Sequence, residues 1–267
     1  MEEGLLKLKK AELQHVELQL IKPVRTKSGL YLPKIMFSGH ELYELGFMAN
    51  TLVRIACCGD ELTFTACGTG LVAYQQEVGE ARKNKELIAY VQAHKSYAGQ
   101  LTLILESNWL KRNGFLTFDV LMMTKEAGCM KARRLPLDVL PIGGVRRLYT
   151  VVANRKKSGK LLPSLRIQGT FLAELQFTLG QLLALTSTTD QLSLTVDPQA
   201  TTAKKVYGQA PTHTRVKQYK GAGNPSLIDL SGFWLYDLGF KPHDKVIVDC
   251  TPSLITIKRL DLSKLHV

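Results

Sequence analysis

The pattern of apolar positions changes from helical to alternating spacing four times along the chain. Each time, a short apolar helical stretch closes on a Phe, and two stretches with apolar residues at every second position follow. Helical spacing predicts an amphipathic helix, and alternation over a few residues predicts a half-buried strand. The four blocks that end in this Phe are LPKIMFSGHELYELGF at 32–47, QLTLILESNWLKRNGF at 100–115, LPSLRIQGTFLAELQF at 162–177 and PSLIDLSGFWLYDLGF at 225–240.

These blocks share a register without gaps, which indicates a tandem array rather than four unrelated segments. The closing residues are Phe47, Phe115, Phe177 and Phe240. Eight positions earlier stand Gly39, Ser107, Gly169 and Gly232, and five positions earlier stand Leu42, Leu110, Leu172 and Leu235. Six positions before the Phe stand Glu41, Trp109, Phe171 and Trp234, where a recurring aromatic next to Leu predicts core packing rather than a ligand site.

Two further strands and two helix caps complete the expected unit. The alternating pairs after each Phe predict a hairpin, at Val53/Ile55 and Leu62/Phe64, Leu121/Met123 and Met130/Ala132, Leu183/Leu185 and Leu192/Leu194, Val246/Val248 and Ile255/Ile257. Ser38 and Ser231 are available as N-caps, and a Gly follows most of the helices as a C-cap. Gln176 stands in place of that Gly, so we expect the third helix to end differently. One unit therefore has the order strand, strand, helix, strand, strand.

A unit of about 45 residues buries too little surface to be stable alone, so we expect two units to intertwine their hairpins into one barrel. The sequence then predicts a mainly β protein with short helices, in which four repeats form two pseudo-dimeric barrels. Turn residues in RRLPLDVLPIGGVRRL at 133–148 favour a boundary near 140. The first barrel is residues 1–140, with repeats at about 13–67 and 85–135, and the second is residues 141–267, with repeats at about 146–197 and 212–260. Adjacency favours pairing first with second and third with fourth, although first with fourth remains an alternative.

The fourth copy, PSLIDLSGFWLYDLGFKPHDKVIVDCTPSLITIKRL, resembles the SymE-like toxin family, a branch of the AbrB-type swapped-hairpin proteins. The first and third copies match well, and the second departs from the pattern at Glu106 and Ser107. The positions that carry the resemblance are Ser231, Gly232, Trp234, Leu235, Gly239, Phe240, Pro242, Asp244, Val246 and Val248.

The resemblance implies swapped-hairpin barrels in a cytoplasmic bacterial protein that binds nucleic acid, regulatory, nucleoid-associated or toxin-like in role, with DNA favoured over RNA as partner. One alternative that it raises is an RNA endonuclease of a toxin–antitoxin system. Another is an adaptor or inhibitor that binds a protein partner through the same fold. Proteins of this type usually carry one unit and dimerise, whereas this chain has four.

The charge distribution supports the nucleic-acid hypothesis. The chain carries 35 Lys and Arg against 23 Asp and Glu, a net charge of +12, and such a basic balance is expected of a phosphate-binding protein. Basic clusters recur just before each repeat, and we expect them on one side of each barrel as a continuous basic face that neutralises phosphates. The candidate nucleic-acid-binding residues are Arg25, Lys27, Lys95, Arg146, Arg147, Arg155, Lys156, Lys157, Lys160, Arg215, Lys217 and Lys220.

Enzyme chemistry has little support in the sequence. The six histidines occupy no common place in the repeat, and no catalytic residue can be assigned, so an endoribonuclease is expected only if the chain is an enzyme. Five cysteines lack the paired spacing of metal sites, and neither a metal nor a cofactor is expected. The charged start of the chain does not resemble a signal peptide, and no apolar run is long enough to span a membrane, so we expect a cytoplasmic, reducing environment.

Overall fold

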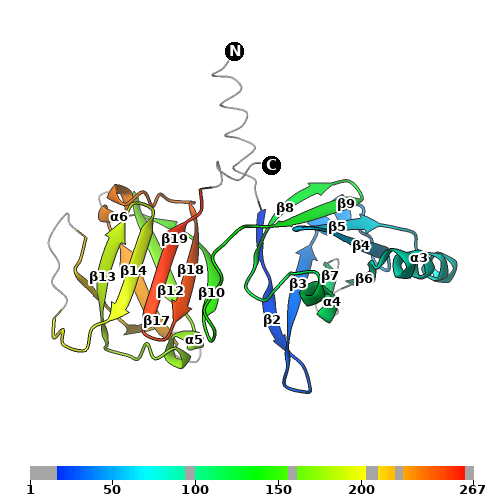
Figure 1. Cartoon of the computed structure of the whole chain (residues 1–267). Helices are drawn as coiled ribbons and strands as arrows, with labels where there is room; N and C mark the ends of the chain where they lie inside the picture. The colour runs from blue at the N-terminus through cyan, green and yellow to red at the C-terminus, as the bar shows by residue number, and fades with distance from the viewer. Residues whose placement is uncertain (1–16, 94–99, 156–160, 203–209, 220–224, 262–267) are drawn as a thin grey trace, which may run out of the picture. The chain divides into compact units, whose positions relative to one another are not determined.

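The computed structural model is mainly β and divides into two compact units, residues 1–138 and 139–267 (Figure 1). It describes residues 17–93, 100–155, 161–202, 210–219 and 225–261. Within these ranges no helix is both long enough and apolar enough to cross a membrane.

Both units are built from two segments. Each segment begins with a leading stretch of one or two strands, continues with an entry strand and a short helix, and ends with a hairpin. The first segment contains β1 (Glu17–Leu20), β2 (Lys22–Arg25), β3 (Tyr31–Gly39), α2 (Glu41–Glu44), β4 (Leu52–Cys58) and β5 (Glu61–Ala66). The second contains β6 (Leu87–Ala93), β7 (Leu101–Glu106), α4 (Asn108–Arg112), β8 (Val120–Glu126) and β9 (Cys129–Arg134). The third contains β10 (Val145–Thr150), β11 (Val152–Arg155), β12 (Leu161–Gln168), α5 (Thr170–Glu174), β13 (Leu182–Thr188) and β14 (Gln191–Val196). The fourth contains β15 (His213–Arg215), β16 (Lys217–Gln218), β17 (Ser226–Ser231), α6 (Trp234–Asp237), β18 (Lys245–Thr251) and β19 (Leu254–Arg259).

The strands of each unit form a nearly closed, barrel-like sheet. In the second unit, a six-stranded sheet has the order β10-β18-β19-β14-β13-β15, and a four-stranded sheet has the order β11-β12-β17-β16. The chain passes from one sheet to the other at Val151, between β10 and β11, and at Val216, between β15 and β16. In the first unit, β1 and β2 lie at the two ends of the order β1-β8-β9-β5-β4-β6-β7-β3-β2 and are joined through Ile21.

The two segments of a unit interleave rather than pack as separate blocks. The hairpin strand β5 pairs with β9, and the entry strand β3 pairs with β7. In the second unit the equivalent pairs are β14 with β19 and β12 with β17. The pairing is therefore between segments adjacent in sequence, the first with the second and the third with the fourth.

One buried residue at the middle of each leading stretch connects the two segments. Val91 donates its backbone N–H to the Thr51 carbonyl over 3.0 Å and accepts the Asn50 N–H over 2.8 Å. The residues in this position are Ile21, Val91, Val151 and Val216, and all four are buried. Their partners are the third and fourth residues after the Phe of the other segment: Phe118 and Asp119 for Ile21, His243 and Asp244 for Val151, and Gly180 and Gln181 for Val216. The exchange is reciprocal within each unit.

The four helices end in the same way, which corrects the expectation for the third. The closing Phe donates its N–H to the carbonyl five residues back, at 2.8 to 2.9 Å, as in a Schellman motif. The residue before it has a left-handed conformation, with φ of 84° at Gly46, 82° at Gly114 and 87° at Gly239. Gln176 adopts the same conformation, with φ of 70°. Tertiary packing of Phe177 evidently imposes this ending on a residue that does not favour it.

The helix starts differ from the predicted caps. Ser38 and Ser231 lie within β3 and β17, and the N-cap positions of α2 and α6 are His40 and Phe233, which make no side-chain cap bond. Ser107 is the residue that caps, because its hydroxyl accepts the Trp109 N–H over 3.0 Å. The departure from Gly in the second copy thus supplies a hydrogen bond that the other helices lack.

The glycine before α5 and the glycine before α6 each accommodate the aromatic residue two positions later. A Cβ on Gly232 would lie 2.4 Å from Cδ1 of Trp234, and one on Gly169 would lie 2.7 Å from Cδ1 of Phe171. Phe171 and Trp234 are buried and belong to the core, as predicted for the aromatic series. Trp109 is partly buried against the core of the first unit, and its Nε1 donates to the Lys85 carbonyl over 2.9 Å.

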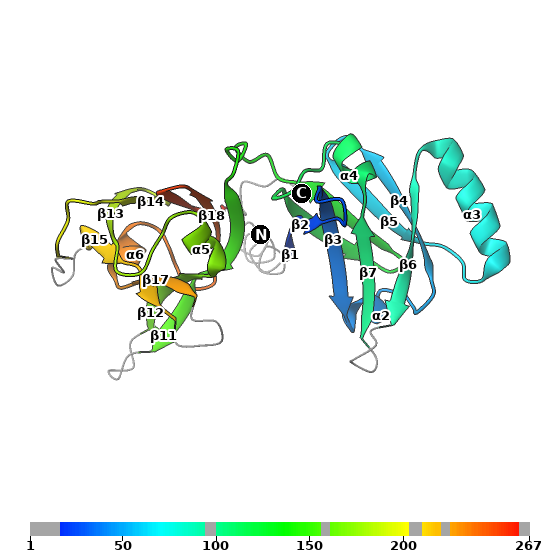
Figure 2. The same ribbon diagram turned by 90° about the horizontal axis from the view of Figure 1, so that it is seen from below.

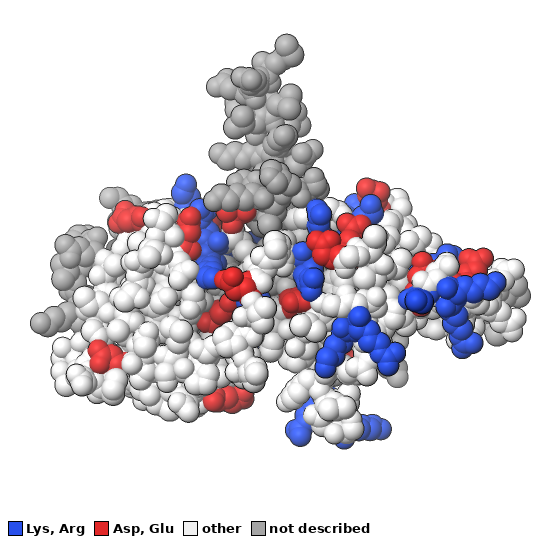
Figure 3. Space-filling view, in the orientation of Figure 1, with Lys and Arg blue, Asp and Glu red and all other residues white. Residues whose placement is uncertain are grey.

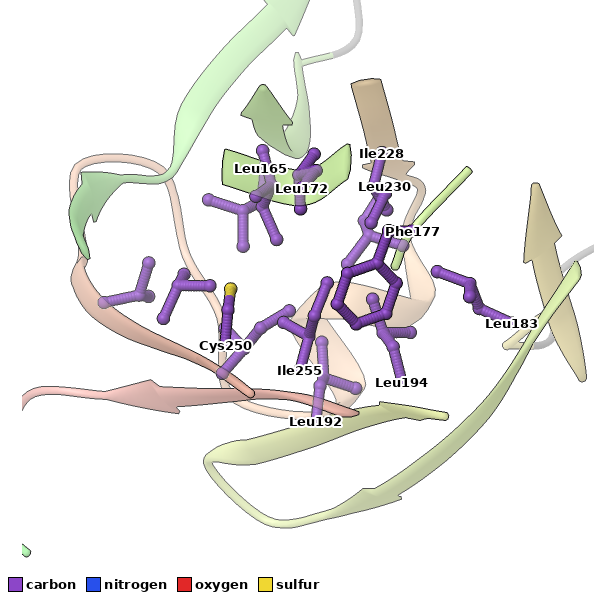
Figure 4. Packing of buried hydrophobic residues seen from close by; sticks show 14 of the residues in the cluster. Leu165, Leu172, Phe177, Leu183, Leu192, Leu194, Ile228, Leu230, Cys250 and Ile255 are labelled. Carbon is purple, nitrogen blue, oxygen red and sulfur yellow. The ribbon is translucent and has the colours of Figure 1, made fainter. Parts of the chain in front are cut away.

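Each unit has one core, and the closing Phe residues lie at its centre. Figure 4 shows Phe177 among leucine and isoleucine side chains from the entry strands and hairpins of both segments of the second unit. The hydrophobic alternation predicted from the sequence is confirmed for every residue of the alternating pairs except Leu185, which is partly buried against the core of the second unit. Cys250 of β18 belongs to the same core without being part of a predicted pair.

The first unit also contains the longest helix of the described chain, α3 (Leu71–Asn84), inserted between β5 and β6. It lies along the outside of the unit beside β6 (Figure 2). Arg54 of β4 holds it through Glu77, with Nε and Nη2 at 3.0 and 2.5 Å from Oε2.

Candidate nucleic-acid interface

Each leading stretch forms a hairpin with its own entry strand. Among the described residues, Arg25, Lys27, Arg155 and Lys217 belong to these hairpins, whereas Arg146 and Arg147 lie on β10 and Arg215 lies on β15. The hairpins are β2–β3, β6–β7, β11–β12 and β16–β17. Ile21, Val91, Val151 and Val216, the buried residues in the middle of the leading stretches, are called the linking residues. Counting from them gives a common register for the four segments that the sequence alone did not provide. Four positions after the linking residue stands a basic residue in every case: Arg25, Lys95, Arg155 and Lys220.

The turn of the β2–β3 hairpin is well ordered by local hydrogen bonds. The Thr26 N–H donates to the Leu30 carbonyl over 2.7 Å, and the Gly29 N–H donates to the Thr26 carbonyl over 3.0 Å. Arg25 and Lys27 are both exposed at this end. The hairpin projects from the first unit, and Figure 3 shows basic side chains around its end. The turn therefore presents two cations from a fixed backbone.

Arg155 occupies the corresponding place at the end of β11. It is exposed and lies opposite Leu161 in the register of β11 and β12. The other predicted residues of this cluster are Lys156, Lys157 and Lys160, which lie outside the described residues, as do Lys95 and Lys220.

Arg215 and Lys217 lie on the leading stretch of the fourth segment, on either side of the buried Val216. Both are exposed. Arg215 donates from Nη1 to the Gly180 carbonyl over 3.2 Å, which leaves its other donors free for a ligand. His213 lies two residues before Arg215, so these two side chains share one face of β15, whereas Lys217 lies on β16 in the other sheet.

The prediction that Arg146 belongs to the nucleic-acid-binding site is wrong, because Arg146 is buried and already paired with Asp249. Only 4% of it is exposed, and its Nε and Nη2 donate to the two carboxylate oxygens of Asp249 over 2.6 and 2.9 Å. Arg147 is half-buried, with its guanidinium 5.1 Å above the ring of Phe171. Arg146 stabilises the pairing of β10 with β18 and is not available to a phosphate.

The predicted continuous basic face is also wrong for the second unit. Arg155 aligns with Leu161 at one end of β12, whereas Lys217 aligns with Leu227, which pairs with Gln168 at the other end. Seven residues of strand separate these ends, or roughly 23 Å at 3.3 Å per residue. The reason is that β12 and β17 are antiparallel, so the two hairpins of a unit point to opposite ends of the sheet. The basic groups form two separate sites.

A hollow next to Arg215 and Lys217 is the feature that the sequence did not indicate. Its volume is about 130 Å³, and its lining residues are Pro211, His213, Thr214, Arg215, Lys217, Asp229, Leu230, Ser231 and Trp234. His213 is held in place, with Nε2 2.9 Å from Asp197 Oδ2 and Nδ1 3.1 Å from Thr212 Oγ1. The hydrogen bond with His213 lowers the pKa of Asp197. The spacing of His213, Arg215 and Lys217 at every second residue was the sequence feature that could have indicated this hollow.

A second hollow, of about 120 Å³, lies under α2, where the first segment has Glu41 in place of an aromatic residue. Lys125 lines it and forms ion pairs with Glu17 and with Glu41, the latter at 2.7 Å. Burial lowers the pKa of Lys125, but its hydrogen bonds with the two carboxylates outweigh this effect and raise it. Glu41 is exposed, and its pairing with Lys125 explains why the core tolerates it there.

Searches against protein-family models, curated proteins and solved structures gave no match for this chain. In the part of the chain that the structure describes, no three His, Cys, Asp or Glu residues are grouped to hold a metal ion.

Proposed function

We propose that this protein binds nucleic acid, DNA in preference to RNA, through the basic ends of its four hairpins. The observation that carries the proposal is the basic residue four positions after the buried linking residue in every segment, at Arg25, Lys95, Arg155 and Lys220. One lysine in a turn is usually a solvated surface residue. The same charge at one register in four otherwise divergent segments favours a common role, because the fold itself does not require a cation there.

The fold proposed to underlie this function is a tandem swapped-hairpin array of the AbrB and SymE-like type, with four copies fused into two pseudo-dimeric barrels. Support comes from the reciprocal hydrogen bonds of Ile21, Val91, Val151 and Val216, which give each unit an internal exchange of equivalent contacts. Such proteins act in the bacterial cytoplasm or at the nucleoid, and we propose the same location here.

The spacing of the basic sites favours duplex DNA. Two sites separated by roughly 23 Å along a sheet correspond to about seven base-pair steps along a duplex axis at 3.4 Å of axial rise per step. A duplex presents phosphates at this separation on a rigid backbone. The cations of both hairpins of one unit can therefore neutralise phosphates of the same duplex. Contacts of this kind fix position and contribute affinity, but they do not read the base sequence. We therefore expect sequence-tolerant binding that weakens steeply with salt.

Fluorescence anisotropy with labelled duplex DNA and RNA, measured at several salt concentrations, tests this proposal. The variant Arg155→Glu/Lys156→Glu/Lys157→Glu reverses one basic hairpin. The control variant is Arg82→Glu/Lys83→Glu/Lys111→Glu, which makes the same change in net charge. All three of these residues are exposed and lie outside the hairpins. We expect salt-sensitive DNA binding that the hairpin variant weakens at least tenfold and the control leaves nearly unchanged. Absence of binding to either polymer at low salt would overturn the proposal and direct the search to protein partners.

A further inference from the structure

The hollow beside β15 and β16 combines features that a single nucleotide requires. Arg215 and Lys217 line the hollow and are exposed, and the half-buried His213 lines it as well. Arginine and lysine are the side chains that proteins use most to bind phosphate oxygens. An anion at the hollow would therefore meet two fixed charges and several donors.

The interior of the hollow offers an acceptor and an apolar surface. Asp229 lines it, and its Oδ1 is buried and has no hydrogen-bond partner among the described residues. Leaving such an oxygen without a donor is costly, and a ligand N–H can remove that cost. Leu230 and Trp234 also line the hollow, and because only 1% of Leu230 and 7% of Trp234 is exposed, the apolar contact that they offer a planar ring is small.

Volume limits the ring that fits. A cavity of about 150 Å³ holds one benzene molecule, and this hollow has about 130 Å³. One six-membered ring therefore fits, whereas the fused rings of a purine would extend out of the hollow. In protein–DNA complexes, a carboxylate of Asp or Glu can accept a hydrogen bond from the amino group of cytosine.

We propose that this hollow binds an unpaired pyrimidine nucleotide, with the phosphate at Arg215 and Lys217 and an N–H of the base at Asp229. The inference rests on the proposed function and extends it, because it gives the second unit a site for one base of a single-stranded segment in addition to phosphate contacts. Both ring nitrogens of His213 are already hydrogen-bonded, so His213 borders the hollow without offering a free nitrogen to the ligand.

The test uses Trp234 as the reporter in the full chain. Trp109 is the other of the two tryptophans, so the Trp109→Phe variant leaves the fluorescence of Trp234 alone. CMP, UMP, AMP and inorganic phosphate are titrated separately. We expect saturable changes with CMP and UMP, binding of AMP about tenfold weaker, and inorganic phosphate acting only as a weak competitor.

Two variants locate the binding groups. Asp229→Asn, which keeps the size of the side chain, should weaken CMP binding about tenfold. Arg215→Ala/Lys217→Ala should remove most of the binding of CMP, while the control Arg82→Ala/Lys83→Ala, at exposed positions of α3, should leave it unchanged. An unchanged near-ultraviolet circular dichroism spectrum shows that each variant is folded.

The outcomes separate this inference from the proposed function. No saturable response to CMP, equal binding of AMP, or equal loss in the Arg82/Lys83 control overturns the nucleotide site. If DNA anisotropy still shows salt-sensitive binding in that case, the proposed function stands without it. Binding of CMP by a protein that binds neither DNA nor RNA would support the hollow as a nucleotide site and overturn the polymer function.

Discussion

The backbone N–H of Asn50 donates to the carbonyl oxygen of Val91 over 2.8 Å and so joins the turn of one segment to the leading strand of the other. Asn50 adopts a left-handed conformation to make this bond, with φ of 65°, and its equivalents Phe118, Gly180 and His243 do the same at 73°, 89° and 73°. Because the exchange is reciprocal, neither segment of a unit has its hydrogen bonds satisfied without the other.

This exchange predicts how fragments of the chain behave. Residues 139–267 should fold alone as a monomer, because this fragment contains both partners of every exchange in the second unit. Residues 139–200, which contain only the third segment, should be unfolded or should dimerise to recover the missing strands. Circular dichroism and analytical ultracentrifugation distinguish these states, and a folded monomer of residues 139–200 would contradict the interleaved arrangement.

A second prediction concerns the strained helix end at Gln176. Gln176→Gly should raise the free energy of unfolding by about 1 kcal/mol, since a left-handed conformation costs a residue with a side chain roughly 1–2 kcal/mol. Gln176 is exposed, so no core contact is lost. The reverse change, Gly46→Gln, should lower the free energy of unfolding by a similar amount. Chemical denaturation measures both, and equal destabilisation by the two changes would be incompatible with the shared helix ending.

Arg146 should matter for stability and not for binding. Removing its side chain leaves the carboxylate of Asp249 without its two donors in a largely buried site, and breaking a buried pair of this kind costs about 3–5 kcal/mol. Arg146→Met should therefore lower the melting temperature. The salt dependence of DNA binding by the folded variant should equal that of the unchanged protein. An unchanged melting temperature together with weakened DNA binding would contradict this prediction and would indicate that Arg146 contacts DNA.

The thiols should differ sharply in reactivity. Burial raises the pKa of Cys250 to about 12, whereas Cys58 is exposed. The thiolate is the reactive form, so native Cys250 should stay unmodified by a thiol reagent at pH 8 while Cys58 reacts. Above pH 9 the unfolded thiol ionises before the folded one, so Cys250 should lower stability progressively between about pH 9 and about pH 12. Mass spectrometry of the labelled peptides checks the reactivity, and Cys250→Ala serves as the reference for the pH effect.

Alternation and the closing Phe residues were sufficient to predict the hairpins and the four short helices, because both patterns are local, whereas the longer helix α3 was not predicted. Long-range pairing was not predictable: Arg146 belongs to a run of basic residues in the sequence, and its partner Asp249 is 103 residues away. The antiparallel pairing of β12 with β17 separates basic clusters that occupy the same position in each repeat. The sequence likewise gave no reason to assign a role to Asp229, since its place in the hollow depends on two strands from different parts of the fourth segment.

The most direct test of the nucleic-acid proposal is the slope of log K against log salt for duplex DNA. Changing Arg25, Lys95, Arg155 and Lys220 together to Ser should reduce the magnitude of this slope by about 3 to 4, since each phosphate contact contributes about 0.9. A control with Arg82, Lys83, Lys111 and Arg112 changed to Ser carries the same net charge and should keep the slope of the unchanged protein. An equal reduction in both variants, or none in either, would contradict the assignment of the four hairpin ends as the phosphate-binding sites.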